Sequence, residues 1–141
     1  RDNTNRYFDC WNGTVTDTVT GLIWLKQWYC LVADWAAANQ AAAAVQDGDC
    51  GLADGSSPGD WRLPTINEAV TIFDKTRANK DFKGGDIHID PVFPPGAGNC
   101  TWTSTTRGER EVQIVFYVNG FSYWYEKNDK TISHAVRLVR R

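Results

Sequence analysis

The chain lacks the features that mark several large classes of protein. It has no methionine, only two histidines, and 15 Lys and Arg against 17 Asp and Glu, which gives a net charge of −2. A dedicated nucleic-acid-binding domain usually carries a strong excess of basic residues, so this balance argues against nucleic acid as a partner. No apolar run approaches the roughly 20 residues that cross a bilayer, and we do not expect a membrane-embedded protein.

The remaining composition is that of one folded domain. The 141 residues are 42% hydrophobic and 23% charged, a length and a composition that suit a single core. We therefore expect one domain over residues 1–141, with residues 1–6 as a loose N-terminal segment. Because the sequence opens at Arg1 and not at a methionine, we expect a mature chain after cleavage or a module of a larger protein.

The four cysteines stand apart from one another, at Cys10, Cys30, Cys50 and Cys100. None forms a Cys-x-x-Cys pair, so the spacing typical of a zinc site is missing. An even number of dispersed cysteines in a small domain indicates two disulfides and an oxidising compartment, although four cysteines allow three pairings. This use of cysteine predicts an exported protein, either secreted or held at the cell surface.

Local patterns in the first half of the chain predict one hairpin and two helices. Thr- and Val-rich stretches on either side of Asp17 favour two short strands. A helix is expected over residues 35–46, where alanine is abundant and Asp34 can serve as the N-cap. Thr65 and Glu68 have the spacing of a capping box, which predicts the start of a second helix.

The last third of the chain favours strands. Asn119-Gly120 is a strong signal for a two-residue hairpin turn between two of them. The strands do not alternate with helices, which argues against a parallel βαβ fold and predicts an α+β class. The expected strands cover residues 101–105, 112–119, 121–126 and 135–139.

Two acidic stretches could in principle hold a cation. In an extended strand, residues 86–90 would place Asp, His and Asp on one face, but a short polar strand explains the pattern as well. Asp47, Asp49 and Asp54 do not match the spacing of an EF-hand, and whether calcium binds near them stays open. We expect no metal and no other cofactor. No arrangement of residues typical of nucleophilic catalysis stands out either, so an enzyme is not expected.

Aromatic residues exceed what one core of this size needs, with seven tryptophans in 141 residues. Four tryptophans are assigned to the core: Trp24, Trp35, Trp61 and Trp102. Exposed aromatic clusters mark binding surfaces, although the remaining rings could instead cover a loop-rich flank of the core. Strand alternation sends one ring of residues 123–125 to the opposite face from the other two, so at least one is expected in solvent. The candidate ligand-binding residues are Trp11, Trp28, Tyr29, Tyr123, Trp124 and Tyr125.

Four segments together resemble a known family. They are GTVTDTVTGLIW at 13–24, GDWRLPTINE at 59–68, TWTSTT at 101–106 and VRLVRR at 136–141. They resemble the Lcl C-terminal-domain family, the module that ends a bacterial collagen-like adhesin. The resemblance implies a C-type-lectin-like fold, shared with formylglycine-generating enzymes, in which two helices flank a twisted antiparallel sheet and the first strand pairs with the last.

The same resemblance bears on the cysteines and on catalysis. It implies a Cys30–Cys50 disulfide, which leaves Cys10–Cys100 as the second. Formylglycine-generating enzymes work through a reactive cysteine pair late in the chain, and here no cysteine follows Cys100. The family likeness therefore does not carry that activity to this chain.

These observations predict a non-catalytic, extracellular bacterial recognition module. It would bind a polysaccharide or a surface glycoconjugate through its exposed aromatic residues and through hydroxyl-rich loops such as residues 103–106. The alternative is a structural or assembly subunit of a surface filament or appendage, in which the aromatic patch is a protein–protein interface and the module self-associates or docks on a partner.

Overall fold

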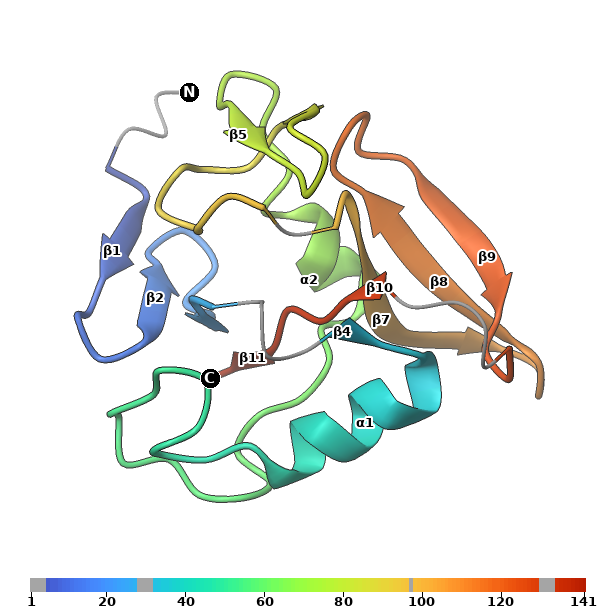
Figure 1. The fold of residues 1–141 in the computed structure, drawn as a ribbon, viewed down its shortest axis with the longest axis horizontal. Helices are drawn as coiled ribbons and strands as arrows, with labels where there is room; N and C mark the ends of the chain where they lie inside the picture. Colours follow the sequence, from blue (N-terminus) through green and yellow to red (C-terminus); the bar gives the residue numbers. More distant parts are fainter. Residues whose placement is uncertain (1–4, 28–31, 97, 130–133) are drawn as a thin grey trace.

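The computed structural model describes residues 5–27, 32–96, 98–129 and 134–141 (Figure 1). The described chain contains two antiparallel-rich sheets, a small two-stranded sheet and two helices, which confirms the α+β class. Among the described residues, no helix has the length and apolar character that crossing a membrane requires.

One sheet joins the two ends of the chain. Its order is β1-β2-β3-β11, with all neighbours antiparallel. The resemblance implied that the first strand pairs with the last, but the last strand pairs with β3, where Val139 lies opposite Trp24. Both of these side chains are fully buried, so burial of apolar surface favours this neighbour. The strands are β1 (Tyr7–Asp9), β2 (Thr14–Asp17), β3 (Ile23–Leu25) and β11 (Val139–Arg140).

The second sheet carries the long hairpin on the right of Figure 1. Its order is β4-β10-β7-β8-β9, and only β10 and β7 run parallel. A separate two-stranded sheet pairs β5 (Asn79–Lys80) with β6 (Asp86–Ile87). The strands of the second sheet are β4 (Val32–Ala33), β7 (Cys100–Arg107), β8 (Glu111–Phe116), β9 (Ser122–Glu126) and β10 (His134–Ala135).

The turn between β8 and β9 is longer than the predicted two residues. Phe116 N–H donates to the Phe121 carbonyl at 2.9 Å, so the four residues 117–120 form the connection. Tyr117 is fully buried, and its hydroxyl donates to the Ala69 carbonyl at 3.1 Å. Because Tyr117 is anchored in the core in this way, it leaves the strand pairing that a two-residue turn at Asn119 would require.

Both helices begin where the sequence predicts. In α1 (Trp35–Ala44), the Asp34 carboxylate accepts from Ala37 N–H at 2.8 Å. The helix ends two residues before the predicted boundary. In α2 (Ile66–Val70), the capping box forms in full between Thr65 and Glu68.

The core consists of two clusters. The first lies beneath α1 and contains Trp61 and Trp102, and the second contains Trp24 and Tyr117. Three of the four tryptophans assigned to the core are at most 2% exposed, as expected. The fourth, Trp35, is only partly buried at the edge of the first cluster.

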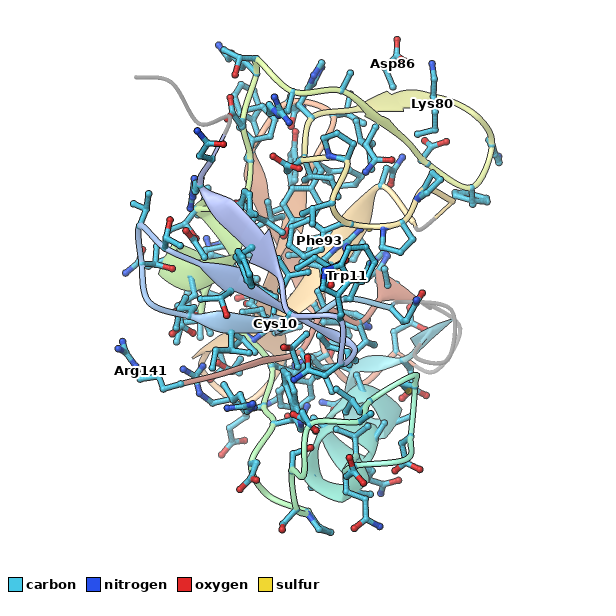
Figure 2. All side chains as sticks on the ribbon, turned by 90° about the vertical axis from the view of Figure 1, so that its left-hand side faces the viewer. Cys10, Trp11, Lys80, Asp86, Phe93 and Arg141 are labelled. Carbon is cyan, nitrogen blue, oxygen red and sulfur yellow. The ribbon has the colours of Figure 1, made fainter. Side chains whose placement is uncertain are left out.

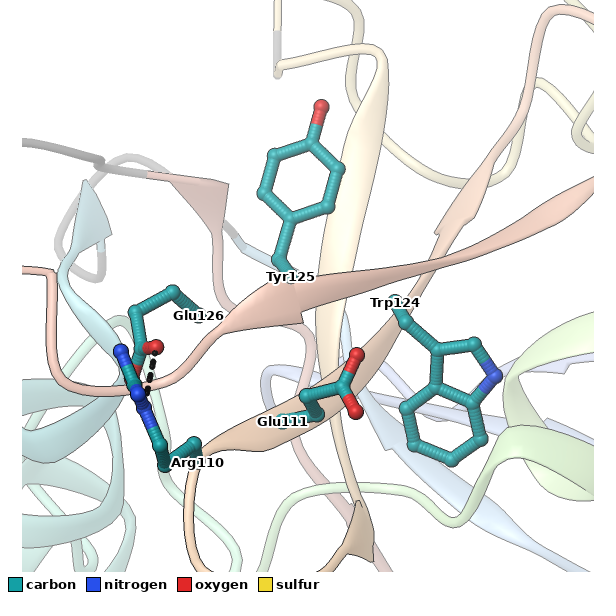
Figure 3. Close-up of a pocket in the computed structure, with 5 residues that line it drawn as sticks. All are labelled: Arg110, Glu111, Trp124, Tyr125 and Glu126. Carbon is teal, nitrogen blue, oxygen red and sulfur yellow. Dashed lines mark hydrogen bonds and ion pairs between the residues drawn. The ribbon is translucent and has the colours of Figure 1, made fainter.

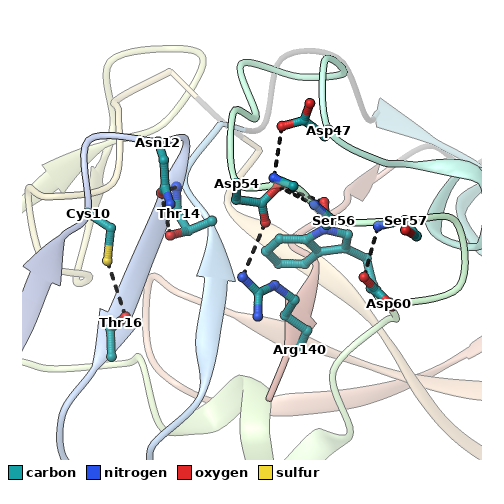
Figure 4. Close-up of polar contacts among 12 residues, drawn as sticks. Cys10, Asn12, Thr14, Thr16, Asp47, Asp54, Ser56, Ser57, Asp60 and Arg140 are labelled. Carbon is teal, nitrogen blue, oxygen red and sulfur yellow. Dashed lines mark hydrogen bonds and ion pairs between the residues drawn. The ribbon is translucent and has the colours of Figure 1, made fainter.

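Charged side chains bind the loops to the strands. Arg6 lies in the segment expected to be loose, but its guanidinium forms two hydrogen bonds with the buried Asp17 carboxylate, at 2.8 and 2.6 Å. Arg140 donates to Asp54 at 3.2 Å (Figure 4). Arg62 forms two hydrogen bonds with Glu68, at 2.6 and 2.8 Å, and therefore fixes the capping box of α2.

The predicted Cys10–Cys100 disulfide is wrong, because both residues are free thiols. Cys10 follows β1 in the first sheet, and its sulfur lies 3.4 Å from the Thr16 hydroxyl (Figure 4). Cys100 begins β7 in the second sheet, and its sulfur lies 2.9 Å from His134 Nδ1. The two sulfurs therefore lie in different sheets, and each has its own polar neighbour. The expected Cys30–Cys50 pairing involves Cys30, which lies outside the described residues.

The thiol assignment predicts different reactivities for the two cysteines. Cys10 is half-buried, whereas Cys100 is 4% exposed, and burial raises the pKa of its thiol to about 12. We expect a maleimide to modify Cys10 in the native protein and Cys100 only after unfolding without reductant, as measured by peptide mass spectrometry. The Cys10→Ser variant is the control. Recovery of a peptide with Cys10 linked to Cys100 would contradict the assignment.

The ion pair between Glu68 and Arg62 is expected to make the stability of the fold depend on pH. The Arg62 hydrogen bonds lower the folded-state pKa of Glu68 from 4.5 to about 2. Its ionised form therefore stabilises the fold above pH 4.5, and this contribution is lost as the pH falls toward 2.

We expect Glu68→Gln to lower the free energy of unfolding by about 1 to 2 kcal/mol near neutral pH and by less in acid. Urea denaturation at both pH values measures the difference. Thr71→Ala, at the C-cap of the same helix, is the control, because it removes a hydroxyl bond to a backbone carbonyl without removing a charge. An equal loss for Glu68→Gln at both pH values would show that the carboxylate charge contributes nothing.

Candidate functional site

The hairpin of β8 and β9 places Trp124 on the outer face of the second sheet. The antiparallel register sets Trp124 opposite Gln113 and Glu126 opposite Glu111. Because side chains alternate along a strand, Trp124 and Tyr125 point to opposite faces, as Figure 3 shows. Trp124 is half-buried, so part of its indole faces solvent.

Arg107 holds the Trp124 ring in place. Its guanidinium carbon lies 4.1 Å from the ring centroid, which is the geometry of a cation–π contact. The same guanidinium donates to both carboxylate oxygens of Glu111, at 3.1 and 2.9 Å. This hydrogen bonding lowers the pKa of Glu111, so the carboxylate is ionised at neutral pH. The indole, the guanidinium and the carboxylate form one connected surface.

An open pocket of about 320 Å³ lies beside this surface. Within it, Arg110 Nε lies 3.1 Å from Glu126 Oε2 (Figure 3). Together with Arg107, the site has two guanidiniums and two carboxylates, so its formal charge is balanced and it offers both donors and acceptors. The lining residues are Arg110, Glu111, Trp124, Tyr125 and Glu126.

Tyr123 and Tyr125 lie on the opposite face of β9. Tyr123 packs edge-on against Phe116, with ring centroids 5.2 Å apart, and is still 41% exposed. Tyr125 packs edge-on against His134 at 5.3 Å and borders the first core cluster. Tyr125 therefore belongs partly to the core, while Tyr123 remains available at the surface.

The other predicted aromatic residues do not join this site. Trp11 is 86% exposed at the bend between β1 and β2, with the Lys26 ammonium 5.5 Å from its ring. That bend lies on the left of Figure 1, on the side that faces the viewer in Figure 2, whereas β9 lies on the right of Figure 1. Trp28 and Tyr29 lie outside the described residues.

The hydroxyls of residues 103–106 are largely used within the fold. The Thr103 hydroxyl donates to the Gln113 carbonyl at 2.7 Å, and the Thr105 hydroxyl accepts from Ile66 N–H at 2.9 Å. These residues belong to strand β7 and not to a loop, so the expected hydroxyl-rich binding loop does not form. Ser104 does line a second open recess of about 270 Å³ between α1 and the segment around Trp61.

The two acidic stretches have separate structural roles. Near α1, Asp47 accepts from Gly55 N–H at 2.9 Å, while Asp54 bonds Ser56 and Arg140 (Figure 4). In residues 86–90, the three side chains have different partners, namely Lys80 for Asp86, the Arg77 carbonyl for His88 and the Arg77 guanidinium for Asp90. Within the described part of the chain, no three His, Cys, Asp or Glu residues converge as metal ligands.

The fold also brings together a cysteine and a histidine that are 34 residues apart. Cys100 and His134 share a hydrogen bond of 2.9 Å, and the Trp102 and Tyr125 rings pack edge-on against the imidazole. Burial raises the pKa of the thiol and lowers that of the imidazole, so both groups are neutral at pH 7. A neutral thiol is a poor nucleophile, and this pair has no thiolate to use in catalysis.

A family model described as the Lcl C-terminal domain matches residues 13–140, which span β2 through β11 and include the whole β8–β9 hairpin. The chain belongs to the Lcl C-terminal domain family. A search of curated proteins found no match.

In this Lcl C-terminal domain, the segments that carried the resemblance build the fold. Trp61 is buried, Arg62 fixes the capping box, and Arg62 also pairs by a backbone bridge with Val139. The Trp124 surface lies outside those segments, and its Arg107 directly follows residues 101–106. Sequence reasoning identified Trp124 but missed Arg107, Arg110, Glu111 and Glu126. The hairpin signal at Asn119-Gly120 was the available clue, because it brings residues near 111 opposite residues near 126.

Proposed function

We propose that this domain is a non-catalytic, extracellular recognition module that binds a neutral polysaccharide or surface glycoconjugate at the Trp124 surface. The observation that carries the proposal is the indole held between Arg107 and a pocket of ionised side chains. An aromatic face packs well against the C–H face of a sugar ring. Charged donors and acceptors beside it form strong hydrogen bonds with hydroxyl groups.

The charge balance of the site supports a neutral ligand. Two guanidiniums are each paired with a carboxylate, at 2.9 Å for Arg107–Glu111 and 3.1 Å for Arg110–Glu126. A sulfated or uronic polymer would bring negative charge next to both carboxylates, and its own charge would compete for the paired guanidiniums. A neutral polyhydroxylated ring meets no such repulsion. Because the pocket is open, we expect weak binding of single sugars and stronger binding of repeating polymers by avidity.

The same proposal includes the relationship of the fold, the location of the protein and the absence of a need for calcium. A C-type-lectin-like fold is supported by the α+β content and by the family membership. Of the cysteines, only a Cys30–Cys50 disulfide would support export, because Cys10 and Cys100 are free thiols. A Cys30–Cys50 disulfide would enclose a loop of about 20 residues and stabilise the domain by about 3 kcal/mol. The Trp124 surface relies on guanidiniums and an indole, so we propose that binding requires no calcium.

A matched pair of tryptophan variants tests the site. We expect Trp124→Ala to weaken binding to neutral glycans at least tenfold, about 1.4 kcal/mol, because the stacking surface is removed. Trp11→Ala is the control, since it removes a more exposed ring on another part of the molecule and should leave binding unchanged. A glycan array with calcium or with chelator, followed by titration calorimetry on the best polymer, measures both variants.

Several results of this experiment would reject the proposal. Equal losses for Trp124→Ala and Trp11→Ala would show that the site is elsewhere, and preferential retention of sulfated polymers would contradict the neutral ligand. A chelator that abolishes binding would contradict the ion-independent mode. No binding to any glycan on the array would exclude the recognition function itself.

A further inference from the structure

Strand β9 is an unprotected edge of the second sheet. It is an outermost strand, and its five residues pair with β8 in a continuous register, without the irregularity that interrupts β7 and β8. Other edge strands of the two sheets are shorter, two residues in β4 and three in β1. Native proteins usually protect long edges with proline, bulges or covering segments. β9 contains no proline, and no strand among the described residues pairs with its outer side.

The register identifies which backbone groups face outward. Phe116 N–H donates to the Phe121 carbonyl at 2.9 Å, and Lys127 N–H donates to the Arg110 carbonyl at 2.8 Å. In an antiparallel pair the hydrogen-bonded positions alternate, so the odd-numbered residues of β9 bond to β8. The even-numbered residues Ser122, Trp124 and Glu126 therefore direct N–H and C=O away from the sheet.

Among the described residues, neither the outward N–H nor the outward C=O of Ser122 and Trp124 has a hydrogen-bond partner. The carbonyl of the third outward residue, Glu126, accepts from Asp129 N–H at 3.3 Å in the following turn. Beside this pair, Phe121 is 63% exposed and Tyr123 is 41% exposed. Free backbone groups next to exposed aromatic rings are the features to which an added strand binds.

We propose that β9 pairs antiparallel with β9 of a second copy of this chain, about a twofold axis at Tyr123. Ser122 then lies opposite Trp124 of the partner subunit, and Trp124 lies opposite the partner's Ser122. Each of these pairs exchanges two backbone hydrogen bonds. The two residues with available groups thus satisfy each other, as a symmetric interface requires.

The side chains also match in this register. Tyr123 meets the partner's Tyr123, and Phe121 meets Tyr125 of the partner subunit, so the exposed rings become cross-strand aromatic pairs. Glu126 lies opposite the partner's Gly120, which leaves no like charges face to face along the strand. This self-complementarity favours a second copy over an unrelated strand.

The glycan site shares strand β9 with this interface, but the interface uses mainly other groups of the strand. It uses the backbone of β9 and the face that carries Tyr123, whereas Trp124 points to the other face with Arg107. Pairing would place two Trp124 surfaces on the same side of one extended sheet. The sequence predicted a structural or assembly subunit as the alternative function. This pairing supplies a defined interface for that alternative, and it can be tested without any glycan.

A proline variant tests the edge directly. Ser122→Pro removes the outward N–H, which takes no part in the pairing with β8, so proline is compatible with this edge position. Ser122→Ala is the matched control, because both variants lose the Gln113–Ser122 side-chain hydrogen bond of 3.3 Å and only one loses the N–H.

We expect sedimentation equilibrium to show a dimer for the wild type and for Ser122→Ala, and a dissociation constant at least tenfold higher for Ser122→Pro. Circular dichroism checks that the proline variant is folded. A wild type that stays monomeric up to submillimolar concentration would overturn the proposal. Equal association of the folded proline and alanine variants would overturn it as well.

A charge-swap experiment tests the register and does not depend on proline. Because residue 123 would face itself across the twofold axis, Tyr123→Glu alone or Tyr123→Lys alone places like charges together and should dissociate the dimer. A mixture of the two variants places opposite charges together and should restore association. No greater association in the mixture than in either variant alone would reject the axis at Tyr123.

Discussion

The pairing of β11 with β3 is the contact on which the rest of the structure depends. Leu25 N–H donates to the Leu138 carbonyl at 2.9 Å, and Val139 exchanges two backbone hydrogen bonds with Arg62, at 3.0 and 3.1 Å. Neighbouring side chains of an extended strand point to opposite sides, so Leu138 enters the first core cluster and Val139 the second. Strand β11 and the residue that precedes it, Leu138, thus close both halves of the core.

The charged side chains of Asp17 and Arg137 are buried in the same fold. Asp17 accepts from Arg6 and also from Val19 N–H at 3.0 Å, so one carboxylate joins the N-terminal segment to a tight turn. Arg137 is different, because the residue is only 2% exposed and its guanidinium has no hydrogen-bond partner among the described residues. The rings of Phe93 and Tyr117 lie 5.6 and 5.8 Å from it, and cation–π attraction offsets part of the cost of burying this charge.

The β8–β9 hairpin separates core packing from the proposed binding surface. On one face, Val112 and Ile114 are fully buried in the first core cluster. On the other face, Trp124 lies under Arg107 beside an open pocket, and few core contacts depend on these side chains. Changes on the outer face therefore cost little packing energy, whereas the edge of the same strand presents backbone groups that every residue except proline would retain.

Local chemistry in the sequence determined the starts of the helices, the α+β class and the burial of three tryptophans. Helix caps and apolar periodicity depend on residues only a few positions apart, so the sequence alone shows them. The tertiary structure decided which distant groups meet. It set Cys100 against His134 and not against Cys10, and it brought Arg107 over Trp124. Such pairs depend on how strands far apart in the chain are ordered and aligned in a sheet, and strand order reflects the packing of the whole core, which no local pattern encodes.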